Sequence, residues 1–281
     1  MTHADVSSAV AAWRDADIDL RVRVHLPALE WNDRLVGRSE RRARHFVTTD
    51  PDGSWVAEDG GRVVGLAQVH RREGLWVLGH LFIAPVAQDR GVGRALLERV
   101  LGYGDPGEPG LIIASRDHRA MRRYALAGFE LRPAIVAWGR VNRSALVADT
   151  QVREGGPQDL DDVAVIDRDV RGAGRCIDHE LSLREGDRLF LFRDRGYAFL
   201  RGSRVSGAGG IDHDAAARCL ATALAEAPPD APAEVSWITG AQQWAVQVAL
   251  ANCLELHPHG PVMVRGEPGP LHPYLPDGAF G

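Results

Sequence analysis

The clearest pattern of hydrophobic and polar positions in this chain lies between residues 75 and 101. Residues 75–84 form an almost unbroken apolar run, which predicts a short strand buried on both faces. Pro85 is expected to end this strand, because proline cannot donate to a strand ladder. Residues 92–101 place apolar side chains at helical spacing, and Gly91 and Gly93 stand at the junction. The stretch is therefore predicted to be a strand, a glycine-containing turn and a helix.

Such a turn is suited to binding an anion. The backbone N–H groups at the start of a helix have no acceptor within it, and the helix dipole favours negative charge there. Gly91 and Gly93 would let a phosphate approach the backbone closely. A simple tight turn without a ligand remains the alternative. The lack of Lys-Ser/Thr after the glycines excludes a nucleotide P-loop, and the spacing of a dinucleotide fingerprint is also absent.

The rest of the first half alternates helical and strand patterns. Residues 5–20 and about 27–47 are predicted to be amphipathic helices. The arginines at 38, 41, 42 and 44 are expected on a solvated face, with attraction of an acidic ligand as the alternative. Residues 54–59 and 62–71 are predicted to pair as a hairpin through a Gly-Gly turn. A buried strand is expected at 111–115, followed by a helix that Asp117 caps and Gly128 ends.

The second half repeats this order of elements without sharing its sequence. A helix is expected from residue 159, a hairpin from 188–194 and 196–202, a helix over 213–227 and a strand over 234–238. A helix over 242–256 and a last strand over 259–266 complete it. The polar segment 149–156 is predicted to be a linker, which gives domains of residues 1–147 and 148–281.

Composition narrows the class of protein. A length of 281 residues suits two domains of about 140. No apolar run approaches the ~20 residues of a membrane span, and no secretory signal is visible. The three cysteines lack zinc or redox spacing, which predicts a reducing cytoplasm and no metal site. A net charge of −5 argues against a nucleic-acid partner, and all 33 basic residues are arginine, as in high-GC bacterial genomes.

Two motifs resemble a known family. Gln88-x-x-Gly91-x-Gly93, preceded by Leu-Phe-Ile-x-Pro, resembles the acetyl-CoA signature of the GNAT superfamily of N-acetyltransferases. Residues 117–129, Asp-x-x-Ala-x-x-x-Tyr-x-x-x-Gly-Phe, resemble its second signature in the proper order and separation. The resemblance implies an α/β (α+β) GNAT fold, a mixed central sheet flanked by helices, in two tandem copies. The departures are a missing opening strand and Asp117 where the family usually has asparagine, for which a capping role is expected.

The resemblance also implies a site. Acetyl-CoA would be the co-substrate, Tyr124 would protonate the leaving thiolate, and backbone N–H groups of the central strand and the glycine turn would hold the coenzyme. The expected coenzyme-binding residues are Leu81, Phe82, Ile83, Gln88, Asp89, Arg90, Gly91, Val92, Gly93, Arg94, Ser115 and Asp117.

The base for the acceptor amine is less clearly indicated. The family places Glu or His at positions equivalent to Val77 and Gly79, which carry no base here. His80 is the neighbouring candidate, but strand alternation points it to the opposite face unless a bulge at Gly79 turns it inward. Glu30 and Glu73 remain open as alternatives. Some multidomain relatives use the terminal carboxylate, which would be that of Gly281 here.

The second copy is predicted to have lost its coenzyme site. Residues 207–210 keep four small positions where the phosphate turn is expected, but Asp212 and Asp214 follow them and would repel a pyrophosphate. The arginines at 168, 171 and 175 would either line an acceptor pocket or form interdomain salt bridges.

The sequence therefore predicts an acetyl-CoA-dependent N-acetyltransferase that transfers an acetyl group directly to a primary amine of a small molecule or peptide. A monomer or homodimer with no nucleic-acid or membrane partner is expected. A non-catalytic acyl-CoA-binding sensor or scaffold module is the alternative. Coenzyme binding by both halves is a third possibility, against which the acidic second turn argues.

Overall fold

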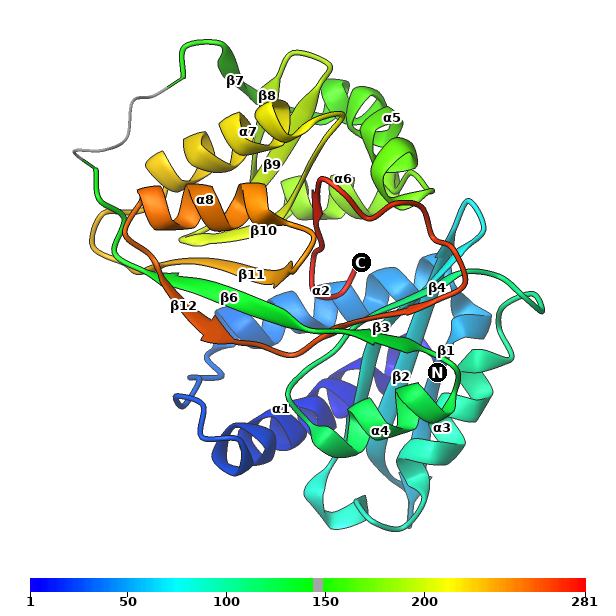
Figure 1. Ribbon diagram of the computed structural model, residues 1–281. Helices are drawn as coiled ribbons and strands as arrows, with labels where there is room; N and C mark the ends of the chain where they lie inside the picture. Colours follow the sequence, from blue (N-terminus) through cyan, green and yellow to red (C-terminus); the bar gives the residue numbers. More distant parts are fainter. Residues whose placement is uncertain (144–148) are drawn as a thin grey trace.

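The computed structural model describes residues 1–143 and 149–281. In these residues the chain forms mixed sheets flanked by helices, in a tandem arrangement, as the sequence predicted (Figure 1). The first half contains α1 (Val6–Arg23), α2 (Asp33–Thr49), β1 (Ser54–Asp59), β2 (Arg62–Arg72), β3 (Leu75–Ile83), α3 (Val92–Leu101), β4 (Gly110–Ile113), α4 (His118–Leu126), β5 (Glu130–Arg132) and β6 (Ala134–Gly139), with 3-10 helices at His3–Asp5, Pro51–Gly53 and Pro85–Ala87.

The second half contains a comparable series. Its elements are β7 (Val152–Gly155), a 3-10 helix (Pro157–Asp159), α5 (Leu160–Arg171), α6 (Cys176–Arg184), β8 (Arg188–Phe192), β9 (Gly196–Arg201), β10 (Arg204–Gly210), α7 (His213–Ala225), β11 (Ala233–Thr239), α8 (Gln243–Ala251), β12 (Glu255–Pro258), β13 (Val262–Arg265) and β14 (Tyr274–Leu275). The predicted boundary between residues 147 and 148 lies outside the described residues.

Three sequence-based assignments were wrong. The segment 149–156, predicted to be a linker, contains β7, which pairs with β8. The second helix begins at Asp33 rather than near 27, because the Asn32 side chain caps it by accepting a hydrogen bond from the Leu35 N–H at 3.0 Å. The helix predicted over 242–256 ends at Ala251, because Cys253 has a φ of 58° that no helix continues through. Glu255–Pro258 then pairs with β6 as a strand.

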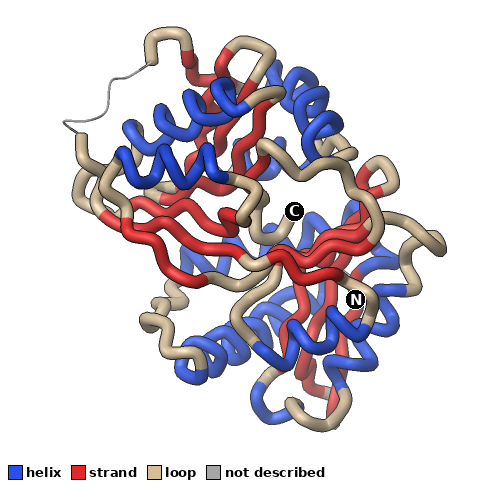
Figure 2. The backbone as a smooth tube through the Cα atoms, viewed as in Figure 1, coloured by secondary structure: helices blue, strands red, loops and turns tan. Residues whose placement is uncertain are grey.

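The two sheets exchange strands. Among the described residues the first sheet has the order β1-β2-β3-β4-β13-β5, so that a strand from the end of the chain lies between two strands of the first half. The second sheet has the order β12-β6-β11-β10-β9-β8-β7, in which β6 is the strand contributed by the first half. Figure 2 shows these strands in the middle of the molecule, between the helices. Each half is therefore completed by a strand of the other.

The hydrophobic cores follow this exchange. One cluster packs the first sheet against α3 and α4, and includes Trp76, Leu97 and Tyr124. Another packs the second sheet against α7 and α8. A third cluster is shared, since it joins Val77 of the first sheet and Phe199 of the second sheet to Val163 of α5. Because burial of this shared cluster requires both domains, they form one continuous packing unit.

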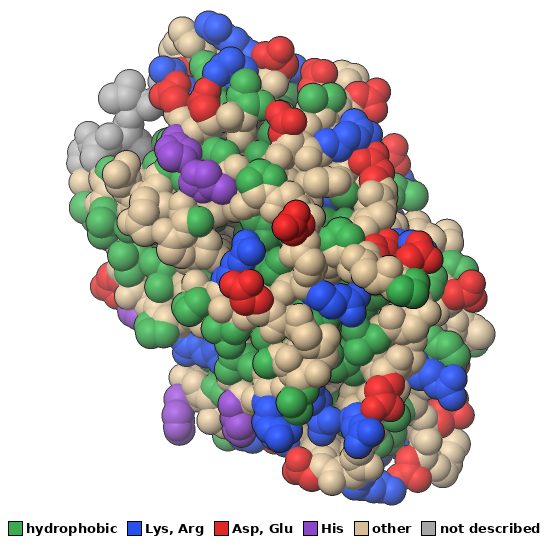
Figure 3. Space-filling view, turned by 45° about the vertical axis from the view of Figure 1, so that its right-hand side comes forward, with side chains coloured by type: hydrophobic (Ala, Val, Ile, Leu, Met, Phe, Trp, Pro, Cys, Tyr) green, Lys and Arg blue, Asp and Glu red, His purple; other side chains and the backbone are tan. Residues whose placement is uncertain are grey.

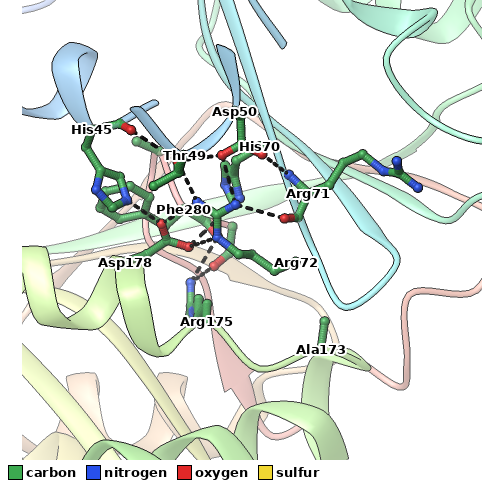
Figure 4. Close-up of polar contacts among 12 residues, drawn as sticks. His45, Thr49, Asp50, His70, Arg71, Arg72, Ala173, Arg175, Asp178 and Phe280 are labelled. Atoms are coloured by element: carbon green, nitrogen blue, oxygen red, sulfur yellow. Dashed lines mark hydrogen bonds and ion pairs between the residues drawn. The ribbon is translucent and has the colours of Figure 1, made fainter. Parts of the chain in front are cut away.

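A buried polar network also links the domains (Figure 4). The Asp178 carboxylate on α6 is fully buried and accepts hydrogen bonds from Arg72 of β2 at 2.8 and 2.9 Å. His45 of α2 lies 2.7 Å from the same carboxylate. Burial alone would raise the pKa of Asp178, but the His45 hydrogen bond and the hydrogen bonds and charge of Arg72 outweigh it and hold the pKa well below its usual range.

Three of the four α2 arginines, at 38, 41 and 42, contact the second half, which corrects the prediction of a solvated face for them. Arg44 pairs with Glu40 of the same helix and is 42% exposed, as predicted. Arg38 pairs with Glu185 at 2.9 Å and with Asp187 at 2.8 Å, across the domain boundary. Arg42 lies over the ring of Phe280 at 4.8 Å. Of the second-half arginines, Arg168 forms an interdomain ion pair with Glu73 at 2.7 Å. That pair also places Glu73 away from the region between β3 and β4.

None of the described helices combines the length and the apolar character that a membrane crossing requires. On the face shown in Figure 3, acidic and basic side chains are interspersed.

Candidate active site

The first sheet opens between β3 and β4. These parallel strands pair from Trp76 with Gly110 to Leu78 with Ile112, and among the described residues β4 supplies no partner to β3 beyond that point. The strands separate there and leave a cleft, which α1 and α4 border. Its lining residues are Ala16, Leu20, Arg23, Leu81, Phe82, Ile83, Gln88, Asp89, Gly91, Gly93, Ser115, Asp117, Arg119, Ala120, Arg123 and Tyr124.

The turn after β3 has the conformation that its sequence suggested. Asp89 and Gly91 have positive φ values of 59° and 83°, and Gly91 is the residue before α3. The first N–H groups of α3 have no acceptor inside the helix and border the cleft. Gln88 holds the turn, because its side-chain N–H group donates to the Ile83 carbonyl at 2.9 Å while Arg119 donates to its side-chain oxygen at 2.9 Å.

Most of the predicted coenzyme-binding residues lie together in this cleft. Leu81, Phe82, Ile83, Gln88, Asp89, Gly91, Gly93, Ser115 and Asp117 are all in its lining. The side chains of Arg90 and Arg94 turn to exposed ion pairs with Asp59 and Glu98, both on the protein surface. Val92 packs against the hydrophobic core. None of these three side chains lines the cleft, so their backbone N–H groups are the predicted contacts with a ligand.

Tyr124 lies on the α4 side of the cleft. It is 5% exposed and packs in the core that contains Leu97 and Met263. Burial raises the pKa of Tyr124 above its ordinary value, and the Asp117 charge acts in the same direction. The tyrosine therefore keeps its proton throughout the neutral pH range.

Asp117 caps α4, as predicted. Its carboxylate accepts a hydrogen bond from the Arg119 backbone N–H at 2.9 Å, and Arg23 and Arg119 both pair with it. Burial alone would raise the pKa of Asp117, but the Arg119 hydrogen bonds outweigh it and lower the pKa. The carboxylate is thus already neutralised by the protein.

His80 is turned by a bulge in β3. Gln68 pairs with His80 and Val69 with Leu78, which leaves Gly79 as the extra residue of β3. His80 consequently lies on the same face as Val77, the face covered by α1 and α2. Its ring is 4.5 Å from that of Trp13 and 5.2 Å from that of Phe46.

The hydrogen bonds of His80 define its tautomer. Its Nδ1 lies 2.9 Å from the Gln68 side-chain oxygen, which can only accept, so Nδ1 carries the proton. Nε2 is buried and has no partner among the described residues. Burial lowers the pKa of His80 to about 3, and the Arg42 charge acts in the same direction. His80 is therefore neutral near pH 7.

Sequence reasoning missed three basic side chains of the cleft, those of Arg23, Arg119 and Arg123. Arg23 comes from α1, far away in the chain, and no local pattern marks it. The helical spacing of Arg119 and Arg123 after Asp117 was the available signal, since it places both on one face of α4. Guanidinium groups beside a helix N-terminus and an apolar strand suit a ligand with phosphates at one end and a neutral arm at the other, which fits acetyl-CoA.

The corresponding place in the second sheet is filled by the chain itself. The parallel strands β10 and β11 pair only at Arg204 with Glu234 and at Val205 with Val235. Beyond that point β14 pairs with β10, Tyr274 opposite Gly209 and Leu275 opposite Ala208. The side chain of Gln242 holds this segment by accepting from the Tyr274 N–H at 3.1 Å and donating to the Leu271 carbonyl at 2.7 Å.

The second turn also differs from its prediction. Residues 207–210 belong to β10 rather than to a turn, and only Ile211 and Asp212 connect that strand to α7. Asp212 caps α7 by accepting from the Ala215 N–H at 2.8 Å and pairs with Arg195. Asp214 pairs with Arg218 at 2.8 Å. The positive end of this helix is thus occupied by a carboxylate of the chain.

The last residues of the chain lie between the domains (Figure 1). A Cβ atom added to Gly79 would stand 3.0 Å from the Ala279 carbonyl, and one added to Gly281 would stand 3.0 Å from the Val77 side chain. Arg171 and Arg175 are buried and donate to the Phe280 carbonyl at 3.3 and 3.2 Å. These two arginines therefore hold the tail against the first sheet.

Comparisons with known proteins agree with this geometry. Residues 18–129 match the model of the Acetyltransferase (GNAT) family. This range contains α2 to α4 and most of the residues that line the cleft. We found no curated protein whose sequence matches the chain.

Solved structures share the fold of the whole chain. A putative acetyltransferase from Pyrococcus horikoshii superposes with a TM-score of 0.80 at 16% identity, over 100% of this chain and 94% of the other. A tandem GNAT protein from the clavulanic acid biosynthesis pathway has a TM-score of 0.54 at 14% identity, over 94% and 96% of the two chains. Eis1 from Mycobacterium abscessus has a TM-score of 0.53 at 17% identity, over 94% of this chain and 72% of Eis1.

Proposed function

We propose that this chain, an acetyl-CoA-dependent acyltransferase whose first domain belongs to the GNAT acetyltransferase family, transfers the acetyl group directly to a primary amine of a small molecule or peptide. The observation that carries the proposal is the open cleft between β3 and β4, in which a helix N-terminus, three arginines and Tyr124 converge. Acetyl-CoA supplies the activated thioester. The second domain binds no coenzyme and shapes the acceptor side.

Each part of the cleft would have one task. The backbone N–H groups of residues 89–94 and the arginines would bind the phosphates. The N–H groups of Leu81 and Ile83, which face the side of β3 that β4 leaves open, would bind the pantetheine arm and polarise the thioester carbonyl. This arrangement leaves the reacting carbonyl at the point where the strands separate.

Proton transfer needs an acid and a base. As the new C–N bond forms and the C–S bond breaks, Tyr124 would give its proton to the leaving thiolate, because burial keeps this hydroxyl protonated near neutral pH. The proton of the attacking amine would go to Nε2 of His80, the ring nitrogen whose lone pair has no partner within the described residues. The bulge at Gly79 supports this role, because it puts His80 on the face of Val77.

The experiment is an acetyl-CoA titration by calorimetry followed by a thiol-release assay with a panel of primary amines. We expect one coenzyme per chain and amine-dependent thiol release. Tyr124→Phe should lower kcat by about 100-fold with little change in acetyl-CoA affinity, as expected for loss of a general acid. Tyr103→Phe, which removes a tyrosine hydroxyl bonded to Asp50 outside the cleft, is the matched control.

The outcomes separate the alternatives. Binding without turnover of any amine would favour the acyl-CoA-binding sensor or scaffold. Equal activity of Tyr124→Phe and wild type would remove Tyr124 from the mechanism. His80→Gln, which keeps a side chain able to donate to Gln68 but has no basic nitrogen, tests the base in the same assay.

We also propose a bacterial cytoplasmic setting. The three cysteines at 176, 219 and 253 are free in the structure, which suits a reducing compartment.

A further inference from the structure

A chamber of about 360 Å³ lies between the two domains, on the face of the first sheet that carries Val77. Its volume falls within the roughly 300–1,000 Å³ of small-molecule sites. The floor is the first sheet, including Leu111 of β4 and the exchanged strand β13. The roof is the end of β11 with the loop after it, and the segment before and after β14. The lining residues are Leu111, Glu130, Leu131, Arg132, Pro133, Trp237, Thr239, Gly240, Ala241, Gln242, Val262, Pro270, Leu271, Tyr274 and Pro276.

We propose that this chamber binds the body of the acceptor, and that the acceptor is a small primary amine with an aromatic or alkyl body. This inference rests on the proposed function and specifies its substrate class. Trp237 of the second domain is the specificity-determining residue.

Trp237 connects the chamber to the coenzyme cleft. It lines the chamber, and its indole N–H donates to the Ala114 carbonyl at 3.3 Å, at the end of β4 where the strands have separated. Ser115, the next residue, lines the coenzyme cleft. The chamber and the coenzyme cleft therefore approach each other at residues 114 and 115. An amine whose body lies in the chamber would direct its nitrogen toward this end of β4.

The backbone of β11 is deformed to place this side chain. Trp237 has a φ of 55°, and the pairing of β11 with β6 shifts register between Val235 and Ile238. A large non-glycine residue in this conformation is strained, so the surrounding structure must enforce it. Gly278 allows the close approach, because a Cβ there would stand 2.7 Å from the indole ring.

The face nearer to the bulge is not free for a ligand body. Phe46 and the Ala279 carbonyl cover Gly79, and the Phe280 ring lies 5.5 Å from that of Phe46. The chamber lies on the same face but farther from the bulge, between β4, β13 and β5 of the first sheet and the residues of the second domain that face them.

The chemistry of the walls determines the class of amine. Leucine, valine, proline and tryptophan side chains dominate the lining, which favours an apolar body. The Tyr274 hydroxyl is buried and has no partner among the described residues, so it can serve one polar group of a ligand. Glu130 and Arg132 both line the chamber, and neither has an ion pair among the described residues, so the two charges offset each other and add no net preference for a polycation. A polyamine would bury charged nitrogens against apolar walls without partners.

The test uses phenethylamine, tyramine and hexylamine as probes, with spermidine as the polycationic comparison. The full-length protein is titrated with phenethylamine by calorimetry in the presence of coenzyme A, and turnover is measured by thiol release. We expect one phenethylamine site per chain and kcat/KM values for the three apolar amines at least about 10-fold above that for spermidine.

Two variants probe the chamber. Thr239→Trp places a large side chain in its lining and should abolish phenethylamine binding, while Trp237→Ala should raise KM at least about 10-fold with acetyl-CoA affinity unchanged. Trp138→Ala, at a 45% exposed tryptophan of the neighbouring strand β6, is the matched control and should change neither quantity.

The result that overturns the inference is phenethylamine binding or turnover that Thr239→Trp and Trp237→Ala leave unchanged, or a preference for spermidine. Absence of phenethylamine binding would also overturn it. Failure of the proposed function is distinguishable, because phenethylamine would then bind in the chamber, sensitive to Thr239→Trp, without any thiol release.

Discussion

Two parallel strand pairs occupy corresponding places in the two domains, β3 with β4 in the first and β10 with β11 in the second. In both pairs the two strands stop bonding to each other after two or three residue pairs. In both, a helix follows the strand that comes first in the chain, α3 after β3 and α7 after β10. The first pair leaves an open cleft lined by arginines and Tyr124. In the second pair β14 bonds to the edge that separation exposes.

The turns that follow β3 and β10 also differ: the first is open to a ligand and the second is closed by the chain. The first has glycine and Asp89 in positive φ conformations and leaves the start of α3 to a ligand, whereas Asp212 closes the start of α7. In the second domain, β14 thus lies where the pantetheine arm of a coenzyme would bind. The Asp212 carboxylate lies where a phosphate of the coenzyme would bind. The backbone groups at an exposed strand edge and at a helix N-terminus require hydrogen-bond partners, and either a ligand or another segment of the chain can supply them.

The largest effect is expected from Gly91→Glu, which would make the first turn resemble the second. A side chain at a φ of 83° is strained, and the added carboxylate repels a phosphate at the same spot. Acetyl-CoA affinity should fall about 1,000-fold, roughly 4 kcal/mol. Calorimetry measures it, with Gly202→Glu as the control, because Gly202 also has a positive φ but lies in a hairpin of the second domain. Near wild-type affinity would place the coenzyme elsewhere.

Leu275→Ala tests β14, the strand that pairs with the exposed edge of β10 in the second domain. Leu275 is 1% exposed in the second core, so its truncation should cost about 2–4 kcal/mol in unfolding free energy. The coenzyme stoichiometry should stay at one per chain, since Asp212 still occupies the helix start. Denaturant unfolding and calorimetry check both, with the 56% exposed Leu250→Ala as the control. A second coenzyme per chain would mean that β14 alone keeps this domain silent.

A pH series on His70→Leu tests the first sheet. His70 is fully buried on β2, and burial lowers its pKa to about 3 from an unfolded value of ~6.5. The unfolded state therefore binds the extra proton between these values, and the stability that a neutral His70 permits is lost as the pH falls below about 6.5. Wild type should lose up to about 1.4 kcal/mol more than His70→Leu between pH 6 and pH 5.

Unfolding by denaturant at both pH values gives this difference. Ile112→Val, a core substitution in the same sheet without a titrating group, should follow wild type at both. An identical pH dependence of wild type and His70→Leu would show that His70 is protonated, or solvated, in the folded protein.

The smallest effect is expected from Arg119→Ala. Arg119 lines the first cleft and is 30% exposed, so the loss of its contact with an anion should lower acetyl-CoA affinity about 5-fold, roughly 1 kcal/mol, and less at high salt. Arg218→Ala removes the corresponding kind of side chain from α7, where Asp149 and Asp214 already pair with it. The Arg218 variant should bind acetyl-CoA like wild type; an equal loss in both would point to a general charge effect.

Local sequence determined the elements around the first cleft. The apolar run of β3, Pro85, the glycines and the spacing of α3 are encoded within about 27 residues, because helix and strand periodicities and positive φ preferences act over a few residues. The same holds for the cap at Asp117 and the hairpin of β1 and β2. From these residues the fold class and most of the cleft lining could be predicted.

Only the tertiary structure decided which strands pair across the chain. β6 and β13 are short strands that either sheet could accept by pattern, and their exchange depends on which edges the folded domains leave open. Tyr274 and Leu275 pair with the exposed edge of β10, and Trp237 contacts Ala114. Local sequence patterns relate none of these residues to their partners. Backbone pairing carries little sequence information, so the sequence determined the parts, and long-range packing determined that one cleft is open and the other is closed.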